Sequence, residues 1–306
     1  ESIGNEYALN GENILKMNIE NLLDLVFDPV KNGNNLNKDF LEIEKDNLKK
    51  VIESKIDDKD SYALDNCIST MYGDNGFGLY KYGYSEDVDK ITIEDISEYY
   101  EWLIQNSKID IFISGNINEE ETKKLLLENE NIKKLKPRIE NYTLNNEFTE
   151  RKQIVENVKE IQENMNVTQG KLVLGLDIVE SMDNLQAVCL VYNSILGDGA
   201  NSMMFQNVRE KASLAYSAKS TFVKQKLNIF IRCGIQIENY EKALELIKVQ
   251  LENIKKGEFT EEDIDNAKTY LISGIKNVEE EQDTEVVFYI GQEISKTNIS
   301  LEEYIK

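Results

Sequence analysis

The sequence predicts an α+β protein made of two similar halves. Each half combines an apolar, strand-like run with several amphipathic helical patterns, and the rough order of strand, helix, strand and long helices recurs in both. Residues 131–152 are rich in Lys, Asn and Glu, contain a proline and lack apolar periodicity, which is typical of a linker. We therefore expect a first domain over residues 1–130 and a second domain over residues 153–306.

The strands and helices follow from the spacing of apolar residues. Strand-like runs lie at 109–114, 153–158, 171–176, 214–222 and 227–237. Helical spacing is found at 12–27, 37–56, 61–71, 92–105, 118–130, 184–196, 240–256, 260–277, 284–295 and 301–306. Two helices begin with the pattern of a capping box, Thr92 with Asp95 and Thr260 with Asp263.

Composition narrows the classes of function. The chain of 306 residues has 57 acidic and 35 basic side chains, a net charge of −22, which disfavours nucleic-acid binding and favours a basic peptide or partner. No apolar run approaches the roughly 18 residues that span a bilayer. The three cysteines are dispersed, which predicts a cytoplasmic protein without disulfides. The absence of histidine excludes His-based catalysis and His-ligated zinc from the residues of this chain.

Residues 193–216 form the most specific pattern in the sequence. An apolar run ends in a glycine turn at 196–199, a short helix then delivers Arg209, and a strand begins with Tyr216 as its first aromatic residue. Arg offers a fork of donors and a Tyr hydroxyl donates or accepts, so together they suit the carbonyl groups of an extended peptide. Spacing alone leaves the alternative open: an exposed Arg209 paired with Glu210 and a Tyr216 buried in the core.

Lys55 lies at an unusual position on the predicted helix 37–56. At about 100° per residue it falls in the middle of the apolar arc, whereas Glu53 points to the opposite, charged side. One interpretation is a lysine that extends past the rim of the core, and the other is a lysine that projects into an internal cavity.

The second half resembles the second domain of insulinase-like proteins (family M16, pitrilysin-type). The resemblance rests on LGDGANSMMFQNVREKASLAYSA at 196–218 and on the two-helix pattern at 240–268. Residues 42–59 and 109–117 are similar to the later part of the first domain of that family, in its Gram-positive bacterial branch. The resemblance implies two homologous α/β-sandwich domains of the LuxS/metallohydrolase-like type, the first of them truncated in this sequence, with further residues before Glu1 and after Lys306.

The resemblance also implies which functional groups this chain has and lacks. Active members hold zinc with an HxxEH motif, which would precede Glu1, and with a Glu on a later helix. Lys55 occupies the place of that Glu, and an ammonium group has no lone pair for a metal. Arg209 and Tyr216 match the pair that binds the substrate backbone. We thus expect no catalytic residue and no metal ligand in this chain.

The leading functional hypothesis is an inactive M16-type subunit that forms a peptide-binding chamber. Its partner would be a zinc-bearing paralogue in a heterodimer, or a second copy in a self-dimer, with zinc only in an active partner. Two alternatives stay open from the sequence. One is an active zinc metallopeptidase with HxxEH upstream and a shifted third ligand, and the other is a stand-alone peptide-binding or scaffold protein.

Overall fold

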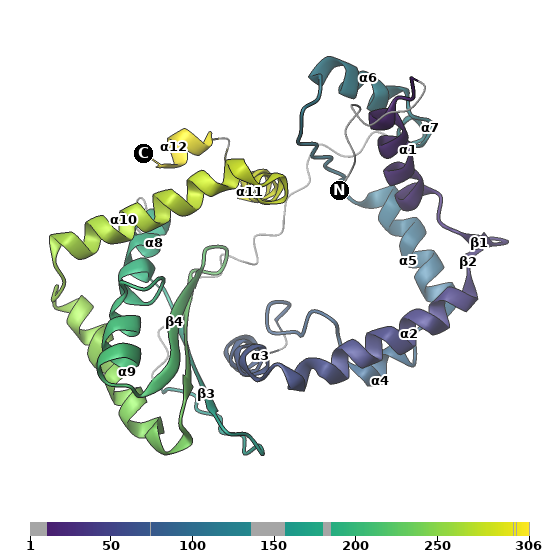
Figure 1. Ribbon diagram of the computed structural model, residues 1–306. Helices are drawn as coiled ribbons and strands as arrows, with labels where there is room; N and C mark the ends of the chain where they lie inside the picture. The colour runs from purple at the N-terminus through teal and green to yellow at the C-terminus, as the bar shows by residue number, and fades with distance from the viewer. Residues whose placement is uncertain are drawn as a thin grey trace. The chain divides into compact units, whose positions relative to one another are not determined.

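The computed structural model (Figure 1) describes residues 11–73, 75–135, 157–179, 185–295, 297 and 299–305. The chain divides into two compact units that alternate along the sequence. Unit 1 comprises Glu1–Lys50, Ser85–Leu144 and Val278–Ser300, and unit 2 comprises Val51–Tyr84, Asn145–Asn277 and Leu301–Lys306. The units do not follow the domain boundaries expected at residues 130 and 153, which stay a prediction.

Unit 1 consists almost entirely of helices. Its elements are α1 (Ile14–Phe27), β1 (Lys31–Asn32), β2 (Asn35–Leu36), α2 (Lys38–Glu53, whose last turn belongs to unit 2), α4 (Ser85–Val88), α5 (Ile93–Asn106), α6 (Glu119–Glu128), α7 (Glu130–Lys133), η6 (Asn277–Glu280) and α11 (Gln282–Ser295). Its buried apolar side chains include Ile19, Leu23, Leu41 and Val88. The capping box at Thr92 and Asp95 is confirmed at the start of α5.

The strand expected at 109–114 is not formed, and this prediction is wrong. The segment is irregular, and the hydroxyl group of its last residue, Ser114, donates to Glu285 of α11. A strand needs a neighbouring strand to pair its backbone groups. Among the described residues of unit 1, only the two-residue strands β1 and β2 are present, and they pair with each other.

Unit 2 contains the sheet and the helices that cover it. Its elements are η2 (Ser54–Asp57), α3 (Lys59–Tyr72), β3 (Gly170–Asp177), α8 (Leu185–Leu196), η4 (Met204–Lys211), β4 (Ala215–Val223), β5 (Asn228–Ile235), η5 (Ile237–Asn239), α9 (Tyr240–Lys255), α10 (Glu261–Lys276) and α12 (Leu301–Ile305). The sheet has the order β3-β5-β4 and is antiparallel throughout. These elements confirm the mixed helix-and-sheet class. The strand expected at 153–158 lies almost wholly outside the described residues.

The two faces of this sheet differ in chemistry. One face is apolar and packs with α8, η4, α9 and α10 around a core that includes Ile231, Cys233 and Ile247. The opposite face meets α3, where a Cβ at Gly175 would lie 2.1 Å from Sδ of Met71, so a side chain at this position would have to displace Met71. Strand residues alternate between faces, so the charged residues of the three strands, Lys171, Asp177, Lys219 and Arg232, share the α3 side, which is the face called the polar face below.

No helix in the described ranges is long and apolar enough to cross a membrane.

Candidate functional site

The glycine turn after α8 is shaped by close packing against β4. A Cβ at Gly197 would lie 2.5 Å from the backbone nitrogen of Ser220, and Gly199 adopts φ +105°. The Ser220 hydroxyl donates to the side-chain oxygen of Asn193 at 2.8 Å, and both residues are buried. The turn therefore holds the end of α8 against the edge strand β4 and sets the direction of the chain that follows.

The short helix expected after this turn is present, but it is a π-helix, η4 (Met204–Lys211). Met204 and Val208 are fully buried on its core side. Asn207 donates to Gln250 of α9 at 2.6 Å, and the N–H of Ala212 donates to the carbonyl of Asn207, five residues earlier. π-helices are rare and are often found at functional sites.

Arg209 projects from η4 with 42% of its side chain exposed. Its Nε lies 3.5 Å from a carboxylate oxygen of Glu210, and its guanidinium carbon lies 4.6 Å from the centre of the Phe205 ring. An exposed Arg209 paired with Glu210 is the arrangement expected if Arg209 has no peptide-binding role. Such a half-exposed pair contributes little to stability, so the guanidinium group can bind a ligand at small cost.

Tyr216 is not a core residue, and that alternative is wrong. The side chain is 53% exposed, at a β-bulge where β4 departs from regular register between Ala215 and Ser217. A bulge changes the direction of a side chain and is frequent next to functional sites. The only partner of the Tyr216 hydroxyl among the described residues is Gln236, whose amide donates at 3.3 Å. Arg209 and Tyr216 lie on packed elements, η4 and β4, and no hydrogen bond joins these two described residues.

Lys55 lies in η2, directly after α2, with 19% of its side chain exposed. Its Nζ is 3.5 Å from a carboxylate oxygen of Asp65 and 4.1 Å from the centre of the Tyr80 ring. The ammonium group is thus held between a carboxylate and an aromatic face. Glu53, the last residue of α2, is exposed, in agreement with its expected place on the charged side.

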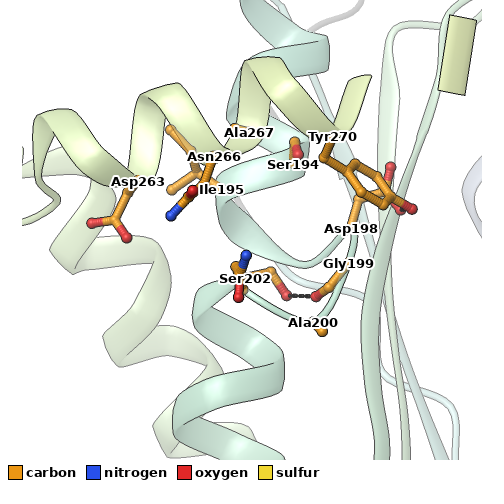
Figure 2. A pocket seen from close by; sticks show the side chains of 11 residues that line it. Ser194, Ile195, Asp198, Gly199, Ala200, Ser202, Asp263, Asn266, Ala267 and Tyr270 are labelled. Atoms are coloured by element: carbon orange, nitrogen blue, oxygen red, sulfur yellow. Dashed lines mark hydrogen bonds between the residues drawn. The ribbon is translucent and has the colours of Figure 1, made fainter. Parts of the chain in front are cut away.

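A small cavity lies beside the glycine turn, between the turn and α10 (Figure 2). Its volume is about 40 Å³, which is the space of about one water molecule. The Ser202 hydroxyl donates to the carbonyl of Gly199 at 2.7 Å, and Tyr270 donates to Asp198 at 3.3 Å. Burial raises the pKa of Asp198 above the usual value. The cavity is too small for a peptide side chain, and we assign it a structural role.

The described residues contain no group of three or more His, Cys, Asp or Glu side chains placed to hold a metal ion. The cysteines are poor candidates for a metal or a nucleophile, because burial raises the pKa of Cys67 to about 11 and that of Cys233 to about 12. Sequence reasoning did not single out one further group, the basic side chains on the polar face of the sheet. The signal was their alternation along the strands, but their convergence depends on strand register.

These features define a mixed α+β protein that exposes an arginine and a tyrosine beside a sheet and, in the described part of the chain, lacks a metal centre. Residues 90–271, more than half of the chain, match the model of the family described as Peptidase M16 inactive domain. The chain belongs to the peptidase M16 family, which confirms the resemblance.

Individual relatives agree with this assignment. The probable inactive metalloprotease YmfF of Bacillus subtilis is 31% identical over 271 residues, which are 88% of this chain and 62% of the relative. The crystal structure of a conserved protein from Enterococcus faecalis matches 99% of this chain and 70% of its own with a TM-score of 0.84 at 25% identity. The peptidase M16 inactive domain from Pseudomonas fluorescens matches 86% of this chain and 62% of its own, with a TM-score of 0.62 at 18% identity, and shows the likeness of the fold. The chain spans less than two thirds of the curated relative.

Proposed function

We propose that this protein is a non-catalytic M16-type subunit that supplies the peptide-holding wall of a chamber. In this proposal Arg209 and Tyr216 hold backbone carbonyl groups of an extended peptide. The observation that carries the proposal is that both side chains are about half exposed, on packed elements, where the guanidinium group and the hydroxyl retain donor capacity.

The surroundings of Lys55 support the proposal that this subunit has no peptidase activity of its own. At the place where the resemblance implies a zinc ligand, the chain has a cation that already interacts with Asp65 and Tyr80. A cation repels Zn²⁺, and the sequence has no histidine that could take over. Zinc and the water-activating group therefore belong, in this proposal, to a paralogue in a heterodimer that acts in the cytoplasm.

The experiment is an affinity purification of the full-length protein from its own cells, followed by identification of what is recovered in equal amount. We expect a paralogue of similar size that carries an intact HxxEH motif. Recovery of the protein alone would leave the chamber without its zinc-bearing half and contradict the heterodimer. A pure protein that by itself binds one zinc ion and cleaves peptides would contradict the inactive subunit and favour the active-enzyme alternative.

A further inference from the structure

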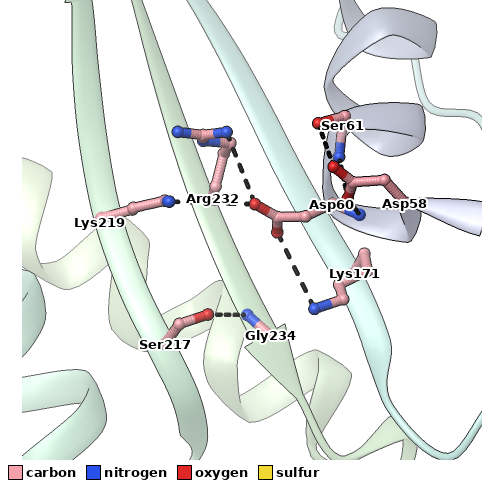
Figure 3. Close-up of polar contacts among 8 residues, drawn as sticks. All are labelled: Asp58, Asp60, Ser61, Lys171, Ser217, Lys219, Arg232 and Gly234. Atoms are coloured by element: carbon pink, nitrogen blue, oxygen red, sulfur yellow. Dashed lines mark hydrogen bonds and ion pairs between the residues drawn. The ribbon is translucent and has the colours of Figure 1, made fainter.

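Three cationic side chains from three different strands converge on the polar face of the sheet. They are Lys171 of β3, Lys219 of β4 and Arg232 of β5, together called the cationic cluster below (Figure 3). Lys219 and Arg232 are direct partners in the register of β4 and β5. Lys171 is opposite Gly234, two positions further along β5, so its side chain points to the same face as Arg232.

A carboxylate shared among the three cations does not fully pair any of them. Asp60, in the first turn of α3, lies 3.5 Å from Arg232, 3.9 Å from Lys171 and 4.0 Å from Lys219. These distances exceed the roughly 2.7–2.9 Å of a charge-assisted hydrogen bond. The carboxylate of Asp58 also interacts electrostatically with Lys171. Its pKa is lowered mainly by hydrogen bonds from Ser61 and least by Lys171.

The cluster therefore keeps both positive charge and unused donors. The three cations share the single carboxylate of Asp60, in a chain whose net charge is −22. Nε of Arg232 is buried and has no hydrogen-bond partner among the described residues. Like charges directly opposite each other on a sheet, such as Lys219 and Arg232, are destabilising. A buried donor without a partner is also destabilising, because it has lost its hydrogen bond to water. Stability alone does not account for this arrangement.

We propose that the cationic cluster binds a carboxylate of an acidic peptide segment. The inference rests on the proposed peptide-holding function and names the substrate class for it. Lys219 follows Tyr216 by three positions on the same edge strand, a distance of about 10 Å. A peptide held at Tyr216 thus reaches the cluster within a few residues. A fork of guanidinium donors with two ammonium groups suits a carboxylate, which has only acceptors.

This inference departs from the expectation of a basic peptide, which was based on net charge. Net charge acts on a ligand at long range and is screened beyond about 8 Å at physiological ionic strength. The cationic cluster acts at contact distance, so the local charge governs which side chain is held there.

The test compares the affinities of labelled, C-terminally amidated, extended peptides for the full-length protein by fluorescence anisotropy. The first peptide carries three Glu residues, the second has Gln in their place, and the third has Lys. We expect the Glu peptide to bind at least about tenfold more tightly than the Gln peptide, the effect of one charged hydrogen bond. The double variant Lys171→Gln/Arg232→Gln should remove this preference and leave the affinity for the Gln peptide unchanged.

The control is the double variant Lys242→Gln/Lys248→Gln, which removes the same charge from exposed positions of α9, a helix packed on the apolar face. It should retain the preference for Glu. Loss of Arg232 leaves the negative charge of Asp60 with one cation fewer beside it, which could lower stability. The side chain of Lys219 is half exposed, so Lys219→Gln serves as a milder variant and should reduce the preference for the Glu peptide about threefold or more. A Gln peptide with a free C terminus distinguishes a terminal carboxylate from side-chain carboxylates.

The outcomes separate the two proposals. Tighter binding of either carboxylate-bearing peptide, lost in the cluster variants, supports the site. Equal affinity for all peptides overturns the cationic cluster as a carboxylate site but leaves the peptide-holding function intact. Tightest binding of the Lys peptide also overturns it. If no peptide binds to the protein alone, the measurement is repeated with the complex purified from its own cells, and absence of binding there as well overturns both proposals.

Discussion

The packing of Gly197 under β4 leads to a prediction that joins the fold to the site. In Gly197→Ala the new methyl group would lie 2.5 Å from the backbone nitrogen and 2.6 Å from the hydroxyl of Ser220. Backbone cannot yield as a flexible side chain does, so α8 and β4 must separate. Two hydrogen bonds join these elements, from the N–H of Ser220 to the carbonyl of Gly197 at 2.9 Å and from the Ser220 hydroxyl to Asn193.

The magnitude follows from these contacts. Overpacking costs about 1–3 kcal/mol, and weakening two hydrogen bonds adds about 1 kcal/mol for each. We expect a loss of about 3–5 kcal/mol, which lowers Tm by roughly 5–8 °C in a chain of 306 residues. Thermal unfolding followed by far-UV circular dichroism measures the change.

A Gly→Ala substitution at a helical position of unit 2 provides a control that should raise Tm instead of lowering it. Gly274 lies in α10, and a Cβ there would meet no atom within 4 Å. Gly274→Ala should stabilise the protein by about 0.5–1 kcal/mol, because alanine loses less conformational entropy in a helix. If Gly197→Ala melts together with the wild type, or if both variants shift Tm in the same direction, the packing argument is refuted.

Three further predictions concern the site and its surroundings. Arg209→Ala should weaken peptide binding by the assembled complex by about 1.5–3 kcal/mol without changing Tm, whereas Lys211→Ala, in the same π-helix, should bind as the wild type does; unchanged affinity in Arg209→Ala would rule out the proposed role. Lys55→Glu should lower the free energy of unfolding by about 1 kcal/mol. The substitution removes a cation that lies against the Tyr80 ring and places a second negative charge beside Asp65. Thermal unfolding measures the change, with Lys55→Met as the comparison. Burial raises the pKa of Tyr72 from 10.0 to about 12, so the folded state holds this proton more tightly than the unfolded state. The stabilisation that comes from the neutral Tyr72 hydroxyl is complete below pH 10 and is lost as pH rises through 12. The free energy of unfolding in urea should therefore fall less steeply with alkaline pH in Tyr72→Phe than in the wild type. Identical pH profiles would contradict the raised pKa of Tyr72.

The elements that local patterns specify were predictable. The capping boxes at Thr92 and Thr260 mark the starts of α5 and α10, because a capping box uses only contacts within one turn. The strands of unit 2 follow from apolar periodicity for the same reason. The helix expected at 37–56 was only partly predictable, because α2 ends at Glu53, Lys55 lies in the 3-10 turn η2, and Val51 and Ile56 of the expected apolar arc are exposed. The resemblance suggests one shared function for Arg209 and Tyr216, which spacing alone could not do, and this function stays a prediction.

Features that depend on distant contacts were not predictable. Apolar residues at 109–114 form a strand only beside another strand, and unit 1 supplies none in its described residues. The apolar pair Met204 and Val208 has the spacing of an ordinary helix, and the additional residue per turn of the π-helix depends on packing. The cationic cluster forms because strand register aligns Lys219 with Arg232 and because α3 brings Asp60 to them.

The central claim is that this chain holds the peptide and a partner supplies the zinc. Native mass spectrometry of the complex purified from its own cells, combined with a peptidase assay, tests the claim most directly. We expect one zinc ion per heterodimer, retained by the partner on dissociation, and no cleavage by this chain alone. One zinc ion on this chain, together with cleavage of peptides in the absence of any partner, would contradict the account.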